Sequence, residues 1–223
     1  MELICSHFDK YPLLTKKHSD FLLFKQAIFL VKQGEHLNME GLKNILALKA
    51  SINLGLPEEL NEAFPDIVPA LRLNFEHSSI ISDLNWFAGF TDAEGCFFVS
   101  IKKSENSTLK EAVSLRFILT QHLRDEELIR SFITILGCGK YIPRPNRYFA
   151  EFVVERFSDL NLKIIPLFEK YKLYGAKRYD FEDFRKVAIL MNKKSHLELS
   201  GLNEIKKIKS NMNKLRTYTL NKI

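Results

Sequence analysis

The sequence predicts an α+β fold in which helices cover one face of an antiparallel sheet and leave the other face open. Two observations lead to this expectation. Several segments alternate between apolar and mixed side chains, as half-buried strands do, and these segments are interleaved with amphipathic helical stretches. With 223 residues, of which 46% are hydrophobic and 27% charged, the chain is long enough and apolar enough to bury a substantial core.

A repeat organises the helices. At an offset of 160 residues, the segment 8–53 matches 168–213 without a gap, with 16 identities in 46 positions. Each copy predicts a long helix, at about 17–34 and 177–194, followed by a turn and a second helix that begins near Gly41 or Gly201. Two copies of one structural unit are therefore expected.

The second copy is preceded by about 85 residues that the first copy lacks. We therefore predict three parts: the helical end of a truncated unit (1–55), a linker (56–81) and a complete unit (82–223). The linker is expected to hold a short helix near 57–64. The complete unit reads helix, two strands, helix, two strands and helices, which is an αββαββα order.

The complete unit opens on the stretch 84–98. Ser82 or Asp83 can cap a helix here. Gly89 and Ala93 fall on one helix face, where the lack of side-chain bulk lets another backbone approach. Gly95 is expected to end the helix with a positive φ. Glu94 then lies at the helix C-terminus, where the macrodipole disfavours a negative charge, so its carboxylate favours a nearby cation.

Three segments, 96–102, 113–121 and 148–155, predict strands with one uniformly apolar face and one mixed face. The apolar faces must pack against helices, which leaves the mixed faces open. The mixed faces carry Cys96, Phe98, Ser100, Lys102, Arg116, Ile118, Thr120, Phe149, Glu151 and Val153. These residues contact a partner or are simply solvated; exposed apolar side chains such as Phe98 and Ile118 favour a partner.

Composition limits the classes of function. A net charge of +6 and a pI near 9.1 favour a polyanionic partner such as nucleic acid. Cys5, Cys96 and Cys138 have no CxxC spacing, which argues against a disulfide framework or a zinc knuckle and favours a reducing compartment. No stretch approaches the roughly 18–20 apolar residues of a membrane span, no targeting peptide is recognisable, and no membrane partner is expected. Motifs of acyl transfer, nucleotide hydrolysis and zinc peptidases are absent.

The nine residues Phe87-Ala88-Gly89-Phe90-Thr91-Asp92-Ala93-Glu94-Gly95 resemble the signature of the LAGLIDADG homing endonucleases. Together with the repeat, they make the whole chain similar to the two-unit monomeric enzymes encoded in fungal mitochondrial introns. The chain differs in lacking the first motif and the first sheet. The resemblance implies an organelle-encoded mitochondrial protein.

The resemblance also implies a mechanism. Two motif helices pack through Gly89 and Ala93, and Glu94 is the catalytic and metal-binding acid. Mg²⁺ is shared between two such acids and the scissile phosphates, where it activates water or stabilises the leaving oxygen. Gln121 orients water or is a polar strand end; Lys177 stabilises phosphate charge or is solvated. Asp92 could accept from N–H groups of the partner helix, and this structural role is favoured over metal binding. The ten mixed-face residues would contact double-stranded DNA, read in the major groove of a saddle-shaped sheet.

Only one motif acid is present, so several functions stay open. The principal expectation is a site-specific, Mg²⁺-dependent double-stranded DNA homing endonuclease. This chain would then be a fragment of such an enzyme, or would be inactive by itself. The alternatives are an RNA maturase that binds intron RNA and assists group I splicing, or a degenerate DNA-binding relic. The missing partner of the motif helix would be an N-terminal half or a second chain.

Overall fold

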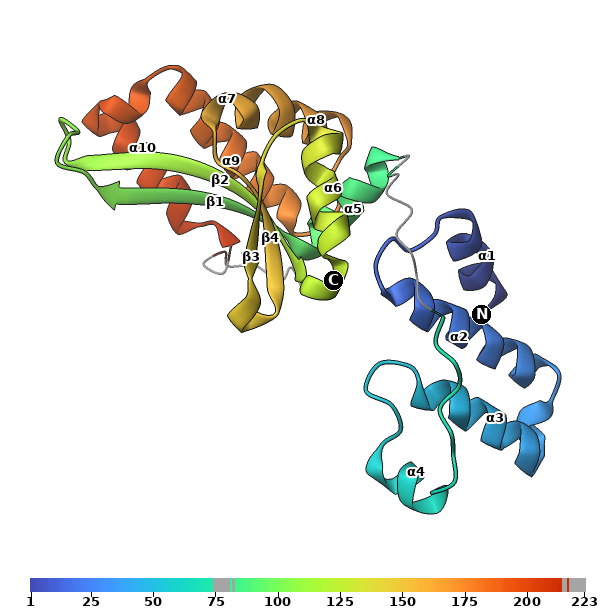
Figure 1. Ribbon diagram of the computed structural model, residues 1–223. Coiled ribbons are helices and arrows are strands. Elements are labelled where there is room, and N and C mark those ends of the chain that lie inside the picture. Colours follow the sequence, from blue (N-terminus) through green and yellow to red (C-terminus); the bar gives the residue numbers. More distant parts are fainter. Residues whose placement is uncertain (74–80, 82, 214–215, 217–223) are drawn as a thin grey trace, which may run out of the picture. The chain divides into compact units, whose positions relative to one another are not determined.

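The computed structural model describes residues 1–73, 81, 83–213 and 216. The chain divides into two compact units, Met1–Ser78 and Ser79–Ile223, and each is considered by itself (Figure 1). None of the helices in the described ranges has the length and apolar character needed to cross a membrane.

The second unit is α+β, as predicted, with a four-stranded antiparallel sheet in the order β1-β2-β4-β3. In Figure 1, α9 and α10 lie along one side of β1 and β2. The elements in chain order are α5 (Leu84–Glu94), β1 (Gly95–Lys103), β2 (Glu111–His122), a 3₁₀ turn (Leu123–Asp125), α6 (Glu126–Leu136), β3 (Lys140–Arg144), a 3₁₀ turn (Pro145–Arg147), β4 (Phe149–Val154), α7 (Phe157–Asp159), a π-helical turn (Leu160–Ile164), α8 (Ile165–Lys170), α9 (Lys177–Asn192), a 3₁₀ turn (Ser195–Leu197) and α10 (Leu199–Ser210).

Phenylalanines fill the space between the sheet and its helices. Phe97 of β1 packs at 5.2 Å from Phe117 of β2 and at 5.4 Å from Phe184 of α9, between ring centroids. Phe87 of α5 packs edge to face on Phe132 of α6 at 5.1 Å. All five rings are fully buried, and each contributes on the order of 1.5–3 kcal/mol through removal of apolar surface from water. This core places α5 and α9 on the covered side of the sheet.

The opposite sheet face is more open, with two exceptions to the prediction. Ser100 is 5% exposed and Val153 is 3% exposed, so neither is an accessible contact residue. Ser100 is short and is flanked on its own face by the longer Phe98 and Lys102. Val153 lies inside the sheet, paired with Lys140 on one side and Ile118 on the other.

The first unit is helical throughout its described residues and repeats the last helices of the second unit. Its elements are α1 (Glu2–Lys10), α2 (Lys17–Lys32), a 3₁₀ turn (Glu35–Leu37), α3 (Met39–Ala50) and α4 (Glu58–Ala63). From α2 to α3 every boundary recurs 160 residues later, and Asn53 and Asn213 share a left-handed φ of 52° and 55°. A Cβ at Gly41 or Gly201 would lie 2.1 or 2.2 Å from the carbonyl oxygen of Glu35 or Ser195, so both copies need glycine there. The structure confirms the repeat; α1 was not predicted.

The two copies differ in what covers them. In α9, Phe184, Val187 and Ala188 are at most 1% exposed because the sheet covers them. The matched residues of α2 (Phe24, Ala27 and Ile28) are each only partly buried, and the described part of the first unit contains no strand. The first unit therefore has the helices of a complete unit without a sheet to cover them.

The last described residues of the predicted linker, 70–73, pack against the helices of the first unit. Ala70 N donates to Ala47 O at 2.9 Å, and Ser19 Oγ donates to Leu73 O at 2.7 Å. Arg72 pairs with Asp20 at 2.9 Å. The part of the predicted linker that the structure describes is thus structurally a continuation of this unit; residues 74–80, and Ser82 as a possible cap, lie outside the described residues.

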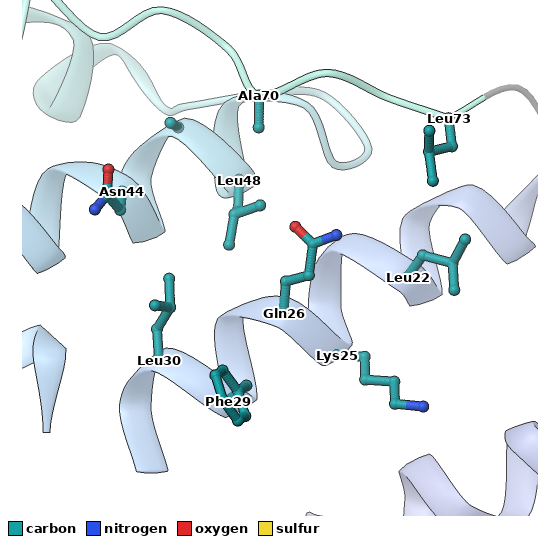
Figure 2. A pocket seen from close by; sticks show the side chains of 10 residues that line it. Leu22, Lys25, Gln26, Phe29, Leu30, Asn44, Leu48, Ala70 and Leu73 are labelled. Atoms are coloured by element: carbon teal, nitrogen blue, oxygen red, sulfur yellow. The ribbon is translucent and has the colours of Figure 1, made fainter. Parts of the chain in front are cut away.

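A groove of about 690 Å³ lies between α2, α3 and residues 70–73. Figure 2 shows its lining, which includes Leu22 and Phe29 of α2, Leu48 of α3 and Leu73 of the extended segment. No carboxylate, histidine or thiol is among the lining residues, so the groove has no group for hydrolytic chemistry.

Candidate functional site

Helix α5 brings one bare surface and one acid together. Asp83 Oδ1 caps its N-terminus by accepting from Asn85 N at 2.8 Å. Phe87, Ala88 and Thr91 face the core and are buried. Because the core side is so closely packed, α5 is held rigidly on the sheet, and its other side is presented outward.

The outward side of α5 has almost no side-chain bulk. Asn85, Gly89 and Ala93 lie one turn apart along it, and all three are exposed. A Cβ placed on Gly89 would meet nothing within 4 Å. Trp86 and Phe90 stack beside this stripe, with ring centroids 5.0 Å apart. The stripe Asn85–Gly89–Ala93 therefore has the shape that a closely packed second helix requires.

Gly95 ends α5, but its conformation is not the predicted one. Its φ is −79° and its ψ is 154°, which is extended backbone open to any residue. Glycine is needed because a Cβ would lie 2.5 Å from both the carbonyl oxygen and Cγ2 of Thr91. The chain thus passes from helix into β1 with no room for a side chain.

Glu94, the last residue of α5, is exposed. Within the described residues its carboxylate makes no hydrogen bond or ion pair, although it lies at the end of the helix where carbonyl groups concentrate negative charge. No three His, Cys, Asp or Glu side chains gather into a metal-binding group in the described ranges. At this position the unit offers a single carboxylate, which fits a hard cation such as Mg²⁺ that takes one or two carboxylates and completes its shell from water and phosphate.

Asp92 binds within its own unit. Its Oδ2 accepts from Tyr174 N at 2.9 Å and from Gly175 N at 3.1 Å. Both donors belong to the loop that precedes α9. The expected contact between Asp92 and a partner helix stays a prediction. A Cβ at Gly175 would lie 3.0 Å from Asp92 Oδ1, so glycine lets this loop approach. Asp92 ties the start of α9 to the end of the motif helix.

This tie brings Lys177 to the candidate site. Lys177 is the first residue of α9, and it lines a cleft of about 680 Å³ together with Asp92, Ala93 and Cys96. Its ammonium makes no hydrogen bond or ion pair with the described residues, whereas the matched Lys17 binds Asp20 at 3.2 Å. Burial raises the pKa of the Cys96 thiol, and the Lys177 charge opposes that shift.

Gln121 lies near the same end of α5. Leu119 pairs with Gly95 across β1 and β2, and Gln121 follows two residues later on the same side of the strand. Gln121 Oε1 accepts from His122 N at 2.8 Å. Strand register thus places Gln121 near the end of α5, and Lys177 lines a cleft beside Ala93; a common site with Glu94 stays a prediction.

The open sheet face holds the accessible members of the predicted contact set. Cys96, Phe98, Arg116, Ile118, Thr120, Phe149 and Glu151 are partly exposed, and Lys102 is exposed. Arg116 lies over the Phe98 ring at 5.1 Å. Register adds residues that the prediction missed: His122, Lys140, Ile142 and Arg144. The last three belong to β3, a short strand interrupted by Pro143 whose alternation is too brief to read from sequence.

A protein-family model described as LAGLIDADG endonuclease matches residues 1–28 and 87–188. The chain belongs to this family. The second matched range contains most of α5, the sheet, Gln121 and Lys177, and the first contains most of α2, including Lys17.

Known relatives agree with this membership. The chain is 37% identical over 220 residues to "Probable intron-encoded endonuclease 2" of Neurospora crassa, covering 94% of this chain and 47% of the relative. It is 31% identical over 115 residues to "Uncharacterized 50.9 kDa protein in ND4 intron 1" of Podospora anserina, covering 50% of this chain and 25% of the relative. This chain thus spans about half the length, or less, of these curated relatives.

Among solved structures, the chain resembles the I-SmaMI LAGLIDADG homing endonuclease bound to cleaved DNA. The TM-score is 0.92 at 44% identity, covering 96% of this chain and 71% of that one. The same endonuclease has also been solved on uncleaved DNA target in the presence of calcium ions.

Proposed function

We propose that this chain carries one half of the active site of a site-specific, double-stranded DNA homing endonuclease. The observation that carries the proposal is Glu94, which is exposed and has no partner among the described residues, at the end of a helix whose Asn85–Gly89–Ala93 stripe is also exposed. A carboxylate so placed is suited to hold a divalent cation at a surface shared with a second helix.

The residues of the site would divide the work as follows. Glu94 would hold Mg²⁺, which when bound lowers the pKa of water and neutralises charge on phosphate oxygens. Gln121 would orient the attacking water by hydrogen bonding. Lys177, which lines the cleft beside Ala93, would stabilise the extra negative charge of the cleaved phosphate.

The open sheet face would bind the DNA. An antiparallel strand pair fits the major groove, where each base pair presents a distinct pattern of donors and acceptors. We propose Cys96, Phe98, Lys102, Arg116, Ile118, Thr120, Phe149 and Glu151 as residues of this contact surface. Support comes from the net charge of +6 and from the apolar side chains that this face otherwise exposes to water.

A second acid is needed for the full site, and the proposed partner is a second motif helix. The domain division into 1–55, 56–81 and 82–223 makes the first part the end of a unit that would supply that helix. The partly exposed Phe24, Ala27 and Ile28 favour an N-terminal half over pairing of two identical chains, because identical chains would leave these residues uncovered.

The test begins with duplexes selected from a random DNA library by binding to the chain, because the target sequence is unknown. Once the missing half is supplied, we expect the protein to cleave a selected target in Mg²⁺. Glu94→Gln should cleave at least about 100-fold less, which is the loss expected when a group that stabilises transition-state charge is removed. Glu127→Gln, an exposed carboxylate on α6, is the matched control. Equal cleavage by the wild type and Glu94→Gln would contradict the assignment.

The alternative partner is intron RNA. If the chain supports splicing of a group I intron, and Glu94→Gln does so equally well while no DNA is cut, the maturase function replaces the nuclease. We further propose a mitochondrial location, supported by the relative named for an ND4 intron. Fractionation of the source cells would test it.

A further inference from the structure

We propose that Arg144, oriented by Glu151, reads a guanine in the major groove. This inference rests on the proposed DNA-binding function and adds a residue that determines base preference. It concerns the outer part of the sheet, on β3 and β4, away from the end of α5.

The strand register places both residues on the open face. Glu151 pairs with Thr120 on one side and Ile142 on the other, and Arg144 pairs with Phe149. Directly paired residues share a face, so Arg144 and Glu151 are diagonal neighbours on the face that carries Thr120. Long side chains bridge such diagonals readily.

The two side chains form a hydrogen-bonded ion pair. Arg144 Nε donates to Glu151 Oε2 at 3.1 Å, and Arg144 Nη2 lies 3.1 Å from the same oxygen as an ion-pair contact. These contacts hold one edge of the guanidinium group against the carboxylate. They leave the Nη1 and Nη2 donors without a hydrogen bond to the described residues.

Charge explains why the pair belongs on this face. A lone carboxylate facing DNA would repel the phosphates, so the negative charge of Glu151 needs a compensating cation on a DNA-binding surface. The Glu151 side chain is 19% exposed and the Arg144 side chain 49% exposed. The Glu151 carboxylate is thus the more buried member of the pair, and the Arg144 guanidinium group is the more accessible to a ligand.

A fixed guanidinium plane with two free end-on donors matches the O6 and N7 acceptors of guanine. Pre-orientation also lowers the side-chain entropy that would otherwise be lost on binding. A solvent-exposed ion pair contributes little to the free energy of folding, so stability alone does not account for the Arg144–Glu151 contact. Orientation of the guanidinium group for base recognition does account for it.

The chain offers a matched control three residues beyond the strand. Arg147 lies in the 3₁₀ turn Pro145–Arg147, is exposed, and makes no ion pair within the described residues. It lines the same hollow as Arg144 but has no carboxylate to orient it. Arg147 is therefore expected to contact phosphate without selecting a base.

The experiment is selection from a random duplex library by the wild-type chain, Arg144→Ala, Arg144→Lys, Glu151→Gln and Arg147→Ala. The wild type should require guanine at one position, and Arg144→Ala should lose about 5- to 150-fold of preference there. Arg144→Lys keeps the charge but should not restore the preference, and Glu151→Gln should reduce it. Arg147→Ala should weaken binding to all sequences equally. It should also reduce the slope of log affinity against log salt concentration by about one, as expected for the loss of one phosphate contact.

Two negative outcomes are distinguishable. If the wild type binds no duplex DNA, the proposed function fails and this inference fails with it. If the wild type binds but Arg144→Ala keeps every base preference, only the assignment of Arg144 is overturned. Thermal unfolding of each variant checks that a lost preference is not a lost fold.

Discussion

At the scale of single residues, Gly89 in the motif helix and Gly95 at its end differ in whether a side chain would fit. Gly95 has ordinary extended backbone, and its constraint is the 2.5 Å approach of Thr91. Gly89 meets nothing within its own unit. The prediction that the helix ends at Gly95 is correct, but the predicted positive φ is wrong. A close approach between Gly95 and the preceding helical turn cannot be recognised from residue types alone.

This contrast predicts opposite effects of alanine. Gly95→Ala should lower the free energy of unfolding by about 1–3 kcal/mol, because Cβ would displace the Thr91 backbone. Gly89→Ala should raise it by about 0.5–1 kcal/mol, because alanine restricts the unfolded chain at a position with free space. Urea unfolding followed by the fluorescence of Trp86, the single tryptophan, measures both in the unit concerned. Destabilisation by Gly89→Ala would show that the stripe is already in contact with something.

At the scale of elements, a single acceptor joins two helices. Asp92 on α5 holds the backbone N–H groups of Tyr174 and Gly175, which precede Lys177 on α9. The sequence predicted both helices and even their repeat, but it could not predict this contact. Residues 82 positions apart have no local pattern that links them, and Asp92 had the chemistry to cap many different N–H groups.

Removal of this acceptor should loosen the start of α9. We expect Asp92→Ala to speed amide hydrogen exchange at Tyr174 and Gly175 by about 5- to 150-fold, equivalent to the 1–3 kcal/mol lost when donors lose their partner. Asp92→Asn keeps an acceptor oxygen and should retain most of the protection. Glu204→Ala, on the exposed side of α10, is the control for loss of charge. Unchanged exchange in Asp92→Ala would mean that packing alone holds the loop.

The sheet shows where pattern reading succeeds and fails. Alternation identified the faces of β1, β2 and β4, because one face of each packs against buried phenylalanines. It also counted Ser100 and Val153 as open, since periodicity gives the side of a strand and not the size of its neighbours. Arg144 went unnoticed on a five-residue strand that contains Pro143.

At the scale of the whole molecule, the repeat supplies an internal comparison. Helices α2 and α9 have matching bounds, but α9 contacts β1, whereas the described part of the first unit holds no strand on which α2 could pack. The difference in burial between α2 and α9 was predictable from the 160-residue repeat, because the strand-bearing region precedes only the second copy in this sequence. The packing of residues 70–73 onto the first unit was not predictable, since a segment rich in proline and polar residues is typical of a connection.

The two helices should therefore differ in stability although their sequences are related. We expect amides around Phe24 and Ile28 to exchange hydrogen at least about 10-fold faster than those around Phe184 and Ala188, because burial of one phenylalanine is worth on the order of 1.5–3 kcal/mol. Hydrogen exchange measured by mass spectrometry compares the matched peptides within one sample, so conditions cancel.

A supplied sheet should remove this difference. A polypeptide with a motif helix and four strands, fused before Met1, should slow exchange in α2 and leave α9 unchanged, because only the first unit has an uncovered face. A polypeptide with the same strands but with charged residues on their apolar faces is the control. If α2 is already as protected as α9 in the chain alone, its apolar side is covered by something other than a sheet, and the proposed N-terminal half loses its main support.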